Sequence, residues 1–326
     1  MKICLLGGSS SQLDEGMNNV AYHLRRELSK RHQVSSLDPR AYCSLSFWKQ
    51  VRSLQPDVIH YTSGPSILSL TLIKLLGLLC QDSQTVVSAL HPWFPWHSEL
   101  LIRTVRPSLV LTQSQTTDIL FRQYGCRTIF VPNGVDVSKF KPVSEGYKQR
   151  LRSHFGVPMG KYVILHVGAV KQKRGVGILS ELQGGDQQVI IAGSPSTGHD
   201  LATLQSLERC GCWVWTDYFD DIERLYGLAD CYVFPTQNPL HAIEIPLSVL
   251  EAMACNLPVV SSAFGGLPEI LDAGEGLVYT HSPEELLQGV QRIRRNKIFI
   301  RTRQKVVAMD WTGIAEQLEN AYRVVM

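Results

Sequence analysis

Short runs of consecutive apolar residues recur along the whole chain and predict buried parallel strands. The runs in the first half are Ile3–Leu6, Val58–Tyr61, Val86–Leu90, Leu109–Thr112 and Ile129–Val131. Those in the second half are Tyr162–Val167, Val189–Ala192, Trp213–Thr216, Cys231–Phe234, Val259–Ser261 and Leu277–Tyr279. Apolar residues at successive positions, without strict alternation, are expected of strands that are covered on both faces.

The segments between these runs carry apolar residues at helical spacing. Val20, Leu24 and Leu28 follow this spacing in the first half, and the segment Pro246–Cys255 follows it in the second. Strands that alternate with helices favour a doubly wound α/β sheet, and eleven strands exceed the usual size of a single sheet. The pattern therefore predicts two Rossmann-like α/β domains.

The stretch Pro132–Tyr147 lacks this periodicity and is rich in proline, glycine and lysine. Such composition is typical of a connection between domains. We therefore predict a first domain over residues 1–140 and a second over residues 141–310. The remaining segment, 311–326, has apolar residues at helical spacing and predicts a final helix.

Composition and charge exclude several classes of protein. The 326 residues include 32 basic and 29 acidic ones, a net charge of +3, which argues against a dedicated nucleic-acid binder. Eight scattered cysteines without a C-x-x-C pair favour free thiols in a reducing compartment. The first apolar run is too short for a signal peptide, and Ile67–Cys80 is shorter than the roughly 20 residues of a membrane span. We expect a cytoplasmic protein.

Candidate chemistry is sought where parallel strands end, because ligands of open α/β sheets bind at the carboxyl edge. Neither the loop Gly7–Gly16 nor the loop Gly168–Gly175 has the compact G-x-G-x-x-G of a dinucleotide site. The second loop carries Lys171, Lys173 and Arg174 beside a turn of small residues. Three cations in this position suit an anionic ligand, and a solvated basic loop is the alternative interpretation.

The segment His241–Cys255 is the most informative part of the chain. A loop with Glu244 leads into an apolar helix, whose first N–H groups, near Leu247 and Ser248, would suit a diphosphate. The carboxylate of Glu251 could accept hydrogen bonds from two vicinal hydroxyls. Ser248 and Glu251 also have the S-x-x-E spacing of a capping box, in which Glu251 would only stabilise the helix start.

These residues resemble the retaining GT-B glycosyltransferases of family 4, also called glycosyl transferases group 1. The similarity runs in order from the Gly16 loop to the Trp311 helix and is carried by Val131–Asp136, Val167–Gly175, Glu244–Val260 and Gly265–Glu269. The resemblance implies a GT-B fold, in which two Rossmann-like doubly wound domains face a central cleft. It also implies that the C-terminal helix, over residues 311–326, crosses back to the first domain.

The resemblance implies a nucleotide-diphosphate sugar as the donor, bound mostly by the second domain. The implied donor-binding residues are Gly16, Gly168, Lys171, Lys173, Arg174, Leu247, Ser248 and Glu251. Among these, Glu251 resembles the carboxylate that holds the ribose hydroxyls. The implied catalytic residues are His91, Glu244 and Arg174. No metal and no further cofactor is expected, because cations and helix N-termini neutralise the leaving diphosphate.

Three positions depart from the family pattern. Glu244 and Glu251 have six residues between them where the family has seven, so that Ile243 occupies the expected place of the first glutamate. Pro246 stands where glycine is common and removes one N–H donor. Ala169 replaces the usual arginine of a basic pair. These departures bear on the role of Glu244 and on the identity of the transferred sugar more than on the class of reaction.

The acceptor is expected on the first domain, where His91–His97 is dense in aromatic residues. Trp93 and Trp96 could stack on a sugar ring or lie at a membrane interface. The nearby apolar helix Ile67–Leu79 is interpreted as a helix of the core, and the basic tract Arg292–Lys305 as a solvated helix face. A glycan or a lipid-linked acceptor, with peripheral contact at the cytoplasmic membrane face, fits these residues.

The resulting hypothesis is transfer of a hexosyl unit, with retention, from a UDP- or GDP-sugar to a hydroxyl of a glycan, a glycolipid or a small acceptor. Two alternatives come from other classes. Ala169 and the shifted Glu244 are compatible with an inactive homologue that serves as a binding or scaffold subunit. A sugar-nucleotide epimerase on the same fold would convert the donor without any acceptor.

Overall fold

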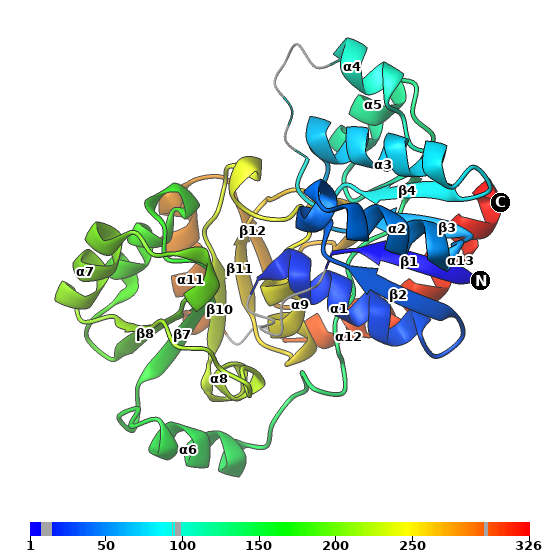
Figure 1. The fold of residues 1–326 in the computed structure, drawn as a ribbon. Helices are drawn as coiled ribbons and strands as arrows, with labels where there is room; N and C mark the ends of the chain where they lie inside the picture. Colours follow the sequence, from blue (N-terminus) through cyan, green and yellow to red (C-terminus); the bar gives the residue numbers. More distant parts are fainter. Residues whose placement is uncertain (8–14, 93, 95–98, 297–298) are drawn as a thin grey trace. The chain divides into compact units, whose positions relative to one another are not determined.

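The computed structural model describes residues 1–7, 15–92, 94, 99–296 and 299–326, and the chain divides into two compact units. The first unit consists of Met1–Gly134, Ile243–Ile245 and Trp311–Met326. The second consists of Val135–Ala242 and Pro246–Asp310. Each unit is an α/β structure with one parallel sheet (Figure 1). The division after Gly134 lies slightly before the boundary that the sequence predicted at residue 140.

The first unit has a six-stranded parallel sheet in the order β2-β1-β3-β4-β5-β6. Its strands are β1 (Lys2–Leu6), β2 (Gln33–Leu37), β3 (Val58–Tyr61), β4 (Gln84–Ser88), β5 (Leu109–Thr112) and β6 (Thr128–Phe130). Its helices are α1 (Gly16–Leu28), α2 (Leu45–Leu54), α3 (Ile67–Leu79), α4 (Glu99–Thr104), α5 (Gln115–Gln123) and α13 (Trp311–Val325), with the 3-10 helix η1 (Pro39–Cys43). Because the strands are parallel, their carboxyl ends share one edge of the sheet.

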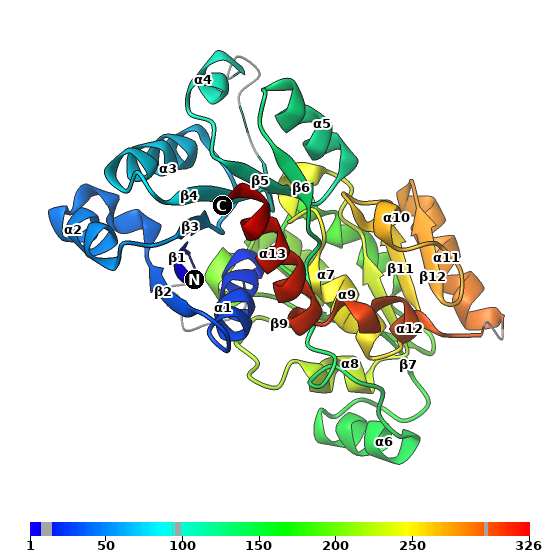
Figure 2. The ribbon, with the colours of Figure 1, turned by 90° about the vertical axis from the view of Figure 1, so that its right-hand side faces the viewer.

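The C-terminal helix α13 belongs to the first unit and lies beside α1 (Figure 2). The ring of Trp311 stacks on His23 with the centroids 4.9 Å apart. A side chain at Gly134 would place its Cβ 2.8 Å from the Trp311 ring, so only glycine fits this close approach. Further along the helix, the buried Tyr322 hydroxyl lies 2.7 Å from His60 Nδ1 of β3. These contacts join the end of the chain to its first strands.

The second unit has a six-stranded parallel sheet in the order β12-β11-β10-β7-β8-β9. Its strands are β7 (Tyr162–Val167), β8 (Gln187–Ala192), β9 (Trp213–Trp215), β10 (Cys231–Phe234), β11 (Val259–Ser262) and β12 (Leu277–Thr280). Its α-helices are α6 (Glu145–His154), α7 (Leu201–Arg209), α8 (Glu223–Leu228), α9 (Leu247–Ala254), α10 (Leu267–Ile270), α11 (Pro283–Arg295) and α12 (Thr302–Val306). Its 3-10 helices are η2 (Gln172–Arg174), η3 (Val176–Leu182), η4 (Pro195–Thr197), η5 (Pro239–His241) and η6 (Val307–Met309).

The strands predicted from apolar runs are all confirmed, and β2 is the strand that the sequence analysis missed. Its sequence, QVSSL, contains no apolar run, and its residues are half-buried or exposed because β2 lies at an edge of its sheet. The periodic segments also form helices as predicted. In the described ranges of the chain, the search for a helix long and apolar enough to cross a membrane finds none.

Helix α3 combines a buried face with an exposed apolar one. Its buried residues include Leu70, Ile73 and Leu76, which contribute to the core of the first unit, so its interpretation as a core helix is confirmed. The opposite side exposes three large apolar residues, Leu68 (58%), Leu75 (48%) and Leu78 (61%). Isolated exposed leucines are ordinary, but three on one helix form an apolar stripe on the surface.

Candidate functional site

Three predicted site residues of the first unit come from distant parts of the sequence and meet where its strands end. The segment Ile243–Ile245 belongs to this unit, and the Glu244 N–H donates to the carbonyl of Leu90, directly before His91. A Cβ at Gly16 would lie 3.1 Å from the side chain of Ile243. The fold thus brings Gly16, His91 and Glu244 together.

The carboxylate of Glu244 is held by hydroxyls of the first unit. Its Oε1 accepts hydrogen bonds from Ser114 Oγ at 2.8 Å and from Thr117 Oγ1 at 2.5 Å. Ser114 is the N-cap of α5, which places the carboxylate at the positive end of that helix. Glu244 is 7% exposed, and the next residue is fixed as well, since Asn133 Nδ2 donates to the carbonyl of Ile245 at 2.7 Å. This setting suits a residue that positions the segment; the predicted catalytic role of Glu244 stays a prediction.

His91 follows β4 and opens the aromatic loop of the first unit. Its side chain is half-buried, and its main chain lies close to Gly64, whose Cβ position is 3.4 Å from the His91 carbonyl oxygen. The two tryptophans that the sequence analysis singled out for the acceptor, Trp93 and Trp96, lie outside the described residues. The structure therefore places His91 at the carboxyl edge of the sheet and leaves the acceptor contacts as predictions.

In the second unit, the basic loop after β7 is anchored through its main chain. The carbonyl of Arg174 accepts a hydrogen bond from Thr236 Oγ1 at 3.1 Å. Gly175 has a φ of +71°, and a Cβ there would lie 3.1 Å from the carbonyl oxygen of Pro235. Both contacts come from the residues that directly follow β10, the strand paired with β7. The loop is thereby held over the carboxyl ends of two adjacent strands.

The cations of this loop differ in exposure. Lys173 is exposed, whereas Lys171 and Arg174 are half-buried. The guanidinium of Arg174 turns back toward the start of the loop, where its Nη1 lies 3.5 Å from the Cβ position of Gly168. A half-buried guanidinium beside a glycine leaves room for an anion to approach both the main chain and the fork of N–H donors.

Helix α9 starts at Leu247, and its N-cap, Pro246, makes no side-chain hydrogen bond. The capping-box interpretation of Ser248 and Glu251 is therefore wrong, because Ser248 is already the second residue of the helix. Both side chains bond to tyrosines instead. Ser248 Oγ lies 2.7 Å from the hydroxyl of Tyr232, and the hydroxyl of Tyr226 donates to Glu251 Oε2 at 2.7 Å.

Tyr232 connects the two parts of the predicted donor site. Its hydroxyl bonds to Ser248 at the start of α9 and also donates to the carbonyl of Val167, the last residue of β7, at 3.3 Å. The start of α9 and the start of the basic loop are thus joined through one side chain of β10. The predicted residues Gly168, Arg174, Leu247 and Ser248 are in consequence held at the same edge of the second sheet.

The environment of Glu251 changes its acidity. Burial raises the pKa of its carboxyl to about 7, while the Tyr226 hydrogen bond and the charge of Lys139 lower it and the charge of Glu223 raises it. Burial also raises the pKa of Tyr226 well above its ordinary value, so this residue stays a hydroxyl donor. A ligand that offers hydroxyl donors to Glu251 would favour its ionised form.

A functional candidate that the sequence analysis missed is His166, in β7. It is 1% exposed, and its Nδ1 lies 2.9 Å from the carbonyl oxygen of Val233. Its Nε2 lies 3.1 Å from the Cβ position of Gly168, at the start of the basic loop. The signal in the sequence is a single histidine inside the apolar run YVILHV, two residues before that loop.

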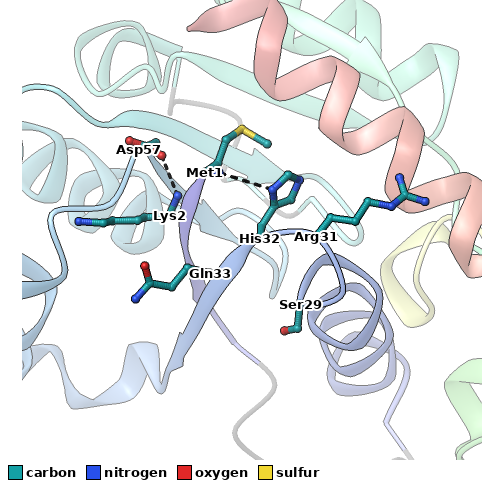
Figure 3. Close-up of a pocket in the computed structure, with 7 residues that line it drawn as sticks. All are labelled: Met1, Lys2, Ser29, Arg31, His32, Gln33 and Asp57. Atoms are coloured by element: carbon teal, nitrogen blue, oxygen red, sulfur yellow. Dashed lines mark hydrogen bonds between the residues drawn. The ribbon is translucent and has the colours of Figure 1, made fainter.

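A surface pocket of the first unit lies at the other edge of its sheet (Figure 3). Its lining residues are Met1, Lys2, Ser29, Arg31, His32, Gln33 and Asp57. Met1, Lys2 and Gln33 stand at the amino ends of β1 and β2, and the Lys2 N–H donates to Asp57 Oδ2 at 2.7 Å. Since open α/β sheets bind ligands at the carboxyl edge, and none of the predicted site residues lines this pocket, we do not assign the site to it.

Comparison with known proteins finds a similarity between part of the second unit and a known family. A family model described as glycosyl transferases group 1 matches residues 161–296. The chain is 27% identical over 243 residues to a D-inositol 3-phosphate glycosyltransferase of Corynebacterium aurimucosum, which covers 67% of the chain and 57% of that protein. It is 25% identical over 304 residues to spore coat protein SA of Bacillus subtilis, covering 82% and 78%. The chain spans about half the length of the first relatives, 57% of one and 46% of another.

Solved structures share the fold over the whole chain. Sucrose-phosphate synthase from Thermosynechococcus elongatus has a TM-score of 0.78 at 17% identity, with 100% of this chain and 99% of that one covered. Anabaena Alr3699/HepE, in complex with UDP-glucose, has a TM-score of 0.70 at 20% identity, with 100% and 98% covered. Residues 161–296 are thus similar to the glycosyl transferases group 1, and the chain as a whole shares its fold with these solved structures.

Proposed function

We propose that this chain is a retaining glycosyltransferase, which moves a hexosyl unit from a UDP- or GDP-sugar to a hydroxyl of an acceptor. The observation that carries the proposal is the double role of Tyr232. Its hydroxyl holds Ser248 of α9 and the carbonyl that ends β7, so that a basic loop and a helix N-terminus with a carboxylate share one sheet edge. A nucleotide-diphosphate sugar needs these groups together: donors for the diphosphate and an acceptor for the ribose hydroxyls.

The second unit would bind the donor through charge and N–H groups. Arg174, with Lys171 and Lys173, and the N–H groups at Leu247 and Ser248 would neutralise the diphosphate as it leaves, without a metal or another cofactor. Glu251 would hold the ribose hydroxyls, which supply the donors that its carboxylate accepts. The structures of Alr3699/HepE were solved with UDP and with UDP-glucose, ligands of the class that we propose here.

The first unit would supply the residues near the transferred sugar and the acceptor. We assign His91 to the sugar, where a neutral imidazole could orient a hydroxyl or stabilise the developing positive charge at the anomeric carbon. Glu244, engaged by Ser114 and Thr117, would hold the segment Ile243–Ile245 in place beside Gly16. The acceptor would be a glycan or a lipid-linked sugar, in contact with the loop of Trp93 and Trp96.

A peripheral membrane contact belongs to the same proposal and rests on helix α3. Leu68, Leu75 and Leu78 are exposed, and Lys74, between them in sequence, is exposed as well. An apolar stripe with a cation suits an anionic lipid surface. Co-sedimentation with vesicles that contain anionic lipid should pellet the wild type and lose most of a variant with serine at these three leucines. Equal pelleting of the two proteins would refute the contact.

The alternative of an inactive binding subunit draws on one specific observation. Glu244 is engaged by two hydroxyls of the first unit, and Ile243 occupies the place where the family has its glutamate. If the reaction requires that glutamate, the chain would bind a nucleotide weakly or not at all and transfer nothing. A sugar-nucleotide epimerase would convert the donor without an acceptor.

An assay with a panel of donors separates these functions. Purified protein is incubated with UDP- and GDP-sugars, with and without simple acceptors, and mass spectrometry follows free nucleotide and sugar products. We expect slow nucleotide release that an acceptor accelerates, together with a product heavier by one hexosyl unit. Isomerised donor without release would favour the epimerase. Nucleotide binding without any conversion would favour the inactive subunit.

A further inference from the structure

His166 has one hydrogen-bonding atom that is accounted for and one that is not. The partner of Nδ1 is the carbonyl oxygen of Val233, which can only accept, so Nδ1 carries the proton. Nε2 of the neutral ring then offers a lone pair and nothing else. Burial, opposed by the hydrogen bond to Val233 and assisted by the charge of Arg174, lowers the pKa of His166 to about 4, so the ring is neutral at physiological pH.

Nε2 faces a small space in which glycine takes the place of a side chain. A Cβ at Gly168 would lie 3.1 Å from His166 Nε2 and 3.5 Å from Arg174 Nη1. A buried acceptor and a cation therefore flank the same point at the start of the basic loop. Among the residues that the structure describes, Nε2 is a buried atom without a hydrogen-bond partner. Such atoms are uncommon in native proteins, because the lost hydration is not replaced.

The chemistry of the site limits what can donate to Nε2. Diphosphate oxygens at neutral pH only accept, so they cannot bond to this atom. The guanidinium of Arg174 has five N–H donors in a planar fork and always carries its charge. Its main chain is held by Thr236 and by the approach of Gly175 to Pro235, so this residue would turn toward Nε2 through its side-chain torsions.

We propose that His166 is a positioning residue for Arg174, whose guanidinium donates one N–H to Nε2 and presents the others to the diphosphate of the bound donor. The inference rests on the proposed function, in which Arg174 contacts that diphosphate. It gives a consequence for Ala169, which stands where the family has a second basic residue. Because Arg174 stands here without the second basic residue of the family's pair, the orientation of its guanidinium determines more of the affinity for the donor.

The first experiment compares two replacements of similar size at His166. His166→Gln keeps a strong acceptor at the position of Nε2, whereas the thioether of His166→Met is only a weak one. Calorimetric titration with UDP and with GDP should show about tenfold weaker binding for His166→Met, the effect of one lost charge-assisted hydrogen bond, and a change below about threefold for His166→Gln. His154→Met, an exposed histidine of α6, is the matched control and should bind as the wild type does. Equal losses for Gln and Met would overturn the inference.

A double-mutant cycle separates the inference from the proposed function. Arg174→Ala should weaken binding, and adding His166→Met to it should cause no further loss, because the acceptor then has no arginine to hold. An undiminished effect of His166→Met in the Arg174→Ala protein would overturn the inference alone. Unchanged affinity of Arg174→Ala, or no binding of UDP or GDP to the wild type, would instead refute the proposed role of Arg174 and the inference with it.

A spectroscopic test observes the unmutated ring of His166 directly. In protein labelled with ¹⁵N histidine, His166 should show a protonated Nδ1 and an unprotonated Nε2, assigned by comparison with His166→Gln. Addition of UDP should shift the Nε2 resonance in the direction of hydrogen bonding in the wild type and leave it unmoved in Arg174→Ala. A protonated Nε2, or the same shift in both proteins, would contradict the inference.

Discussion

Two carboxylates separated by six residues, Glu244 and Glu251, illustrate how differently the two units are built. Glu244 belongs to the first unit, is 7% exposed and accepts hydrogen bonds from Ser114 and Thr117, more than 120 residues away in sequence. Glu251 belongs to the second unit and is half-buried; its hydrogen-bond donor among the described residues is Tyr226, 25 residues away. The carboxylate of Glu244 thus accepts hydrogen bonds from side chains of its own unit. The carboxylate of Glu251 can accept further hydrogen bonds, which a ligand could donate.

Two glutamates that are close in sequence can therefore have different roles. Glu244 lies at the N-terminus of α5, where two hydroxyls and the helix dipole favour its position. Glu251 lies in a setting that disfavours its charge, since burial raises the pKa of its carboxyl to about 7. A residue held at a cost to its ionised form, beside a basic loop, is typical of a binding site.

The largest effect is expected for Glu251→Gln. The amide keeps the size of the side chain but loses the charged acceptor for two ribose hydroxyls, so turnover in the donor assay should fall about 100-fold. The thermal midpoint should stay the same or rise at neutral pH, because the substitution removes a charge that burial disfavours. Glu208→Gln, at an exposed position of α7, is the control. Wild-type turnover in Glu251→Gln would refute the assignment of this residue to the donor.

The opposite pattern is expected for Glu244→Gln. The amide oxygen of glutamine can accept both hydroxyl hydrogen bonds, but it carries no charge, so the buried Ser114 and Thr117 would each donate to a weaker acceptor. The free energy of unfolding should fall by about 2 kcal/mol, measured by denaturant titration. Glu99→Gln, exposed on α4, should change it by less than about 0.5 kcal/mol.

The double variant Ser114→Ala, Thr117→Val gives a second view of the same group. It should reduce stability by at least as much as Glu244→Gln, because the carboxylate loses both donors and α5 loses its N-cap side chain. A loss of turnover in Glu244→Gln without any loss of stability would reverse the comparison and make Glu244 the catalytic residue that the sequence predicted.

These contrasts show what the sequence could and could not predict. The residues of the second unit were found in two segments, Val167–Gly175 and Leu247–Glu251, because the loops that follow adjacent parallel strands converge at one edge of the sheet. The choice between a capping role and a ligand role for Glu251 needed Tyr226 and Tyr232, whose hydroxyl partners no spacing rule identifies. The same holds for His166: only the structure shows that its Nδ1 bonds to the carbonyl of Val233 and that its Nε2 is buried without a hydrogen-bond partner.

The first unit was predicted well as a fold and poorly as a site. Apolar runs identify five of its strands, and α3 has the predicted bounds, whereas β2 escaped because an edge strand needs no apolar run. The partners of Glu244 are short hydroxyl side chains, which occur on every surface of a protein and carry no distinctive pattern. The sequence contains many serines and threonines, and it does not indicate which two of them donate hydrogen bonds to a glutamate.

A third prediction concerns pH and follows from the raised pKa of Glu251. Between the ordinary pKa of a glutamic acid and about 7, the folded protein holds a proton that the unfolded chain releases, so the stability contributed by this group falls as pH rises through this window. Because the side chain is only half-buried, the effect is on the order of 1 kcal/mol. Denaturant titrations of wild type and Glu251→Gln at pH 5 and pH 8 should show this difference in the wild type alone.

Ligand binding should show the opposite trend with pH at the same residue. The ribose hydroxyls donate to the ionised carboxylate, so affinity for UDP-glucose should rise as pH increases through about 7. The diphosphate of this ligand keeps its charge across the window, which leaves Glu251 as the group that changes. Equal pH dependence in Glu251→Gln would assign the effect to another group.

The smallest effect is expected at the contact that fixes the C-terminal helix to the rest of the first unit. The ring of His60 bonds to the Tyr322 hydroxyl through Nδ1 and to Ser88 Oγ through Nε2, each at 2.7 Å, and all three residues are buried. Burial lowers the pKa of His60 to about 3, so the neutral ring needs both partners. Tyr322→Phe leaves one ring nitrogen without a partner and should reduce the free energy of unfolding by about 1 kcal/mol.

Tyr22→Phe, at an exposed position of α1, removes a hydroxyl from the same unit and should change stability by less than about 0.5 kcal/mol. Donor affinity should be the same in both variants, because the proposed donor residues belong mostly to the second unit. If Tyr322→Phe weakened UDP binding as strongly as Glu251→Gln, the donor would depend on the packing of the first unit. The division of labour that the two carboxylates suggest would then be wrong.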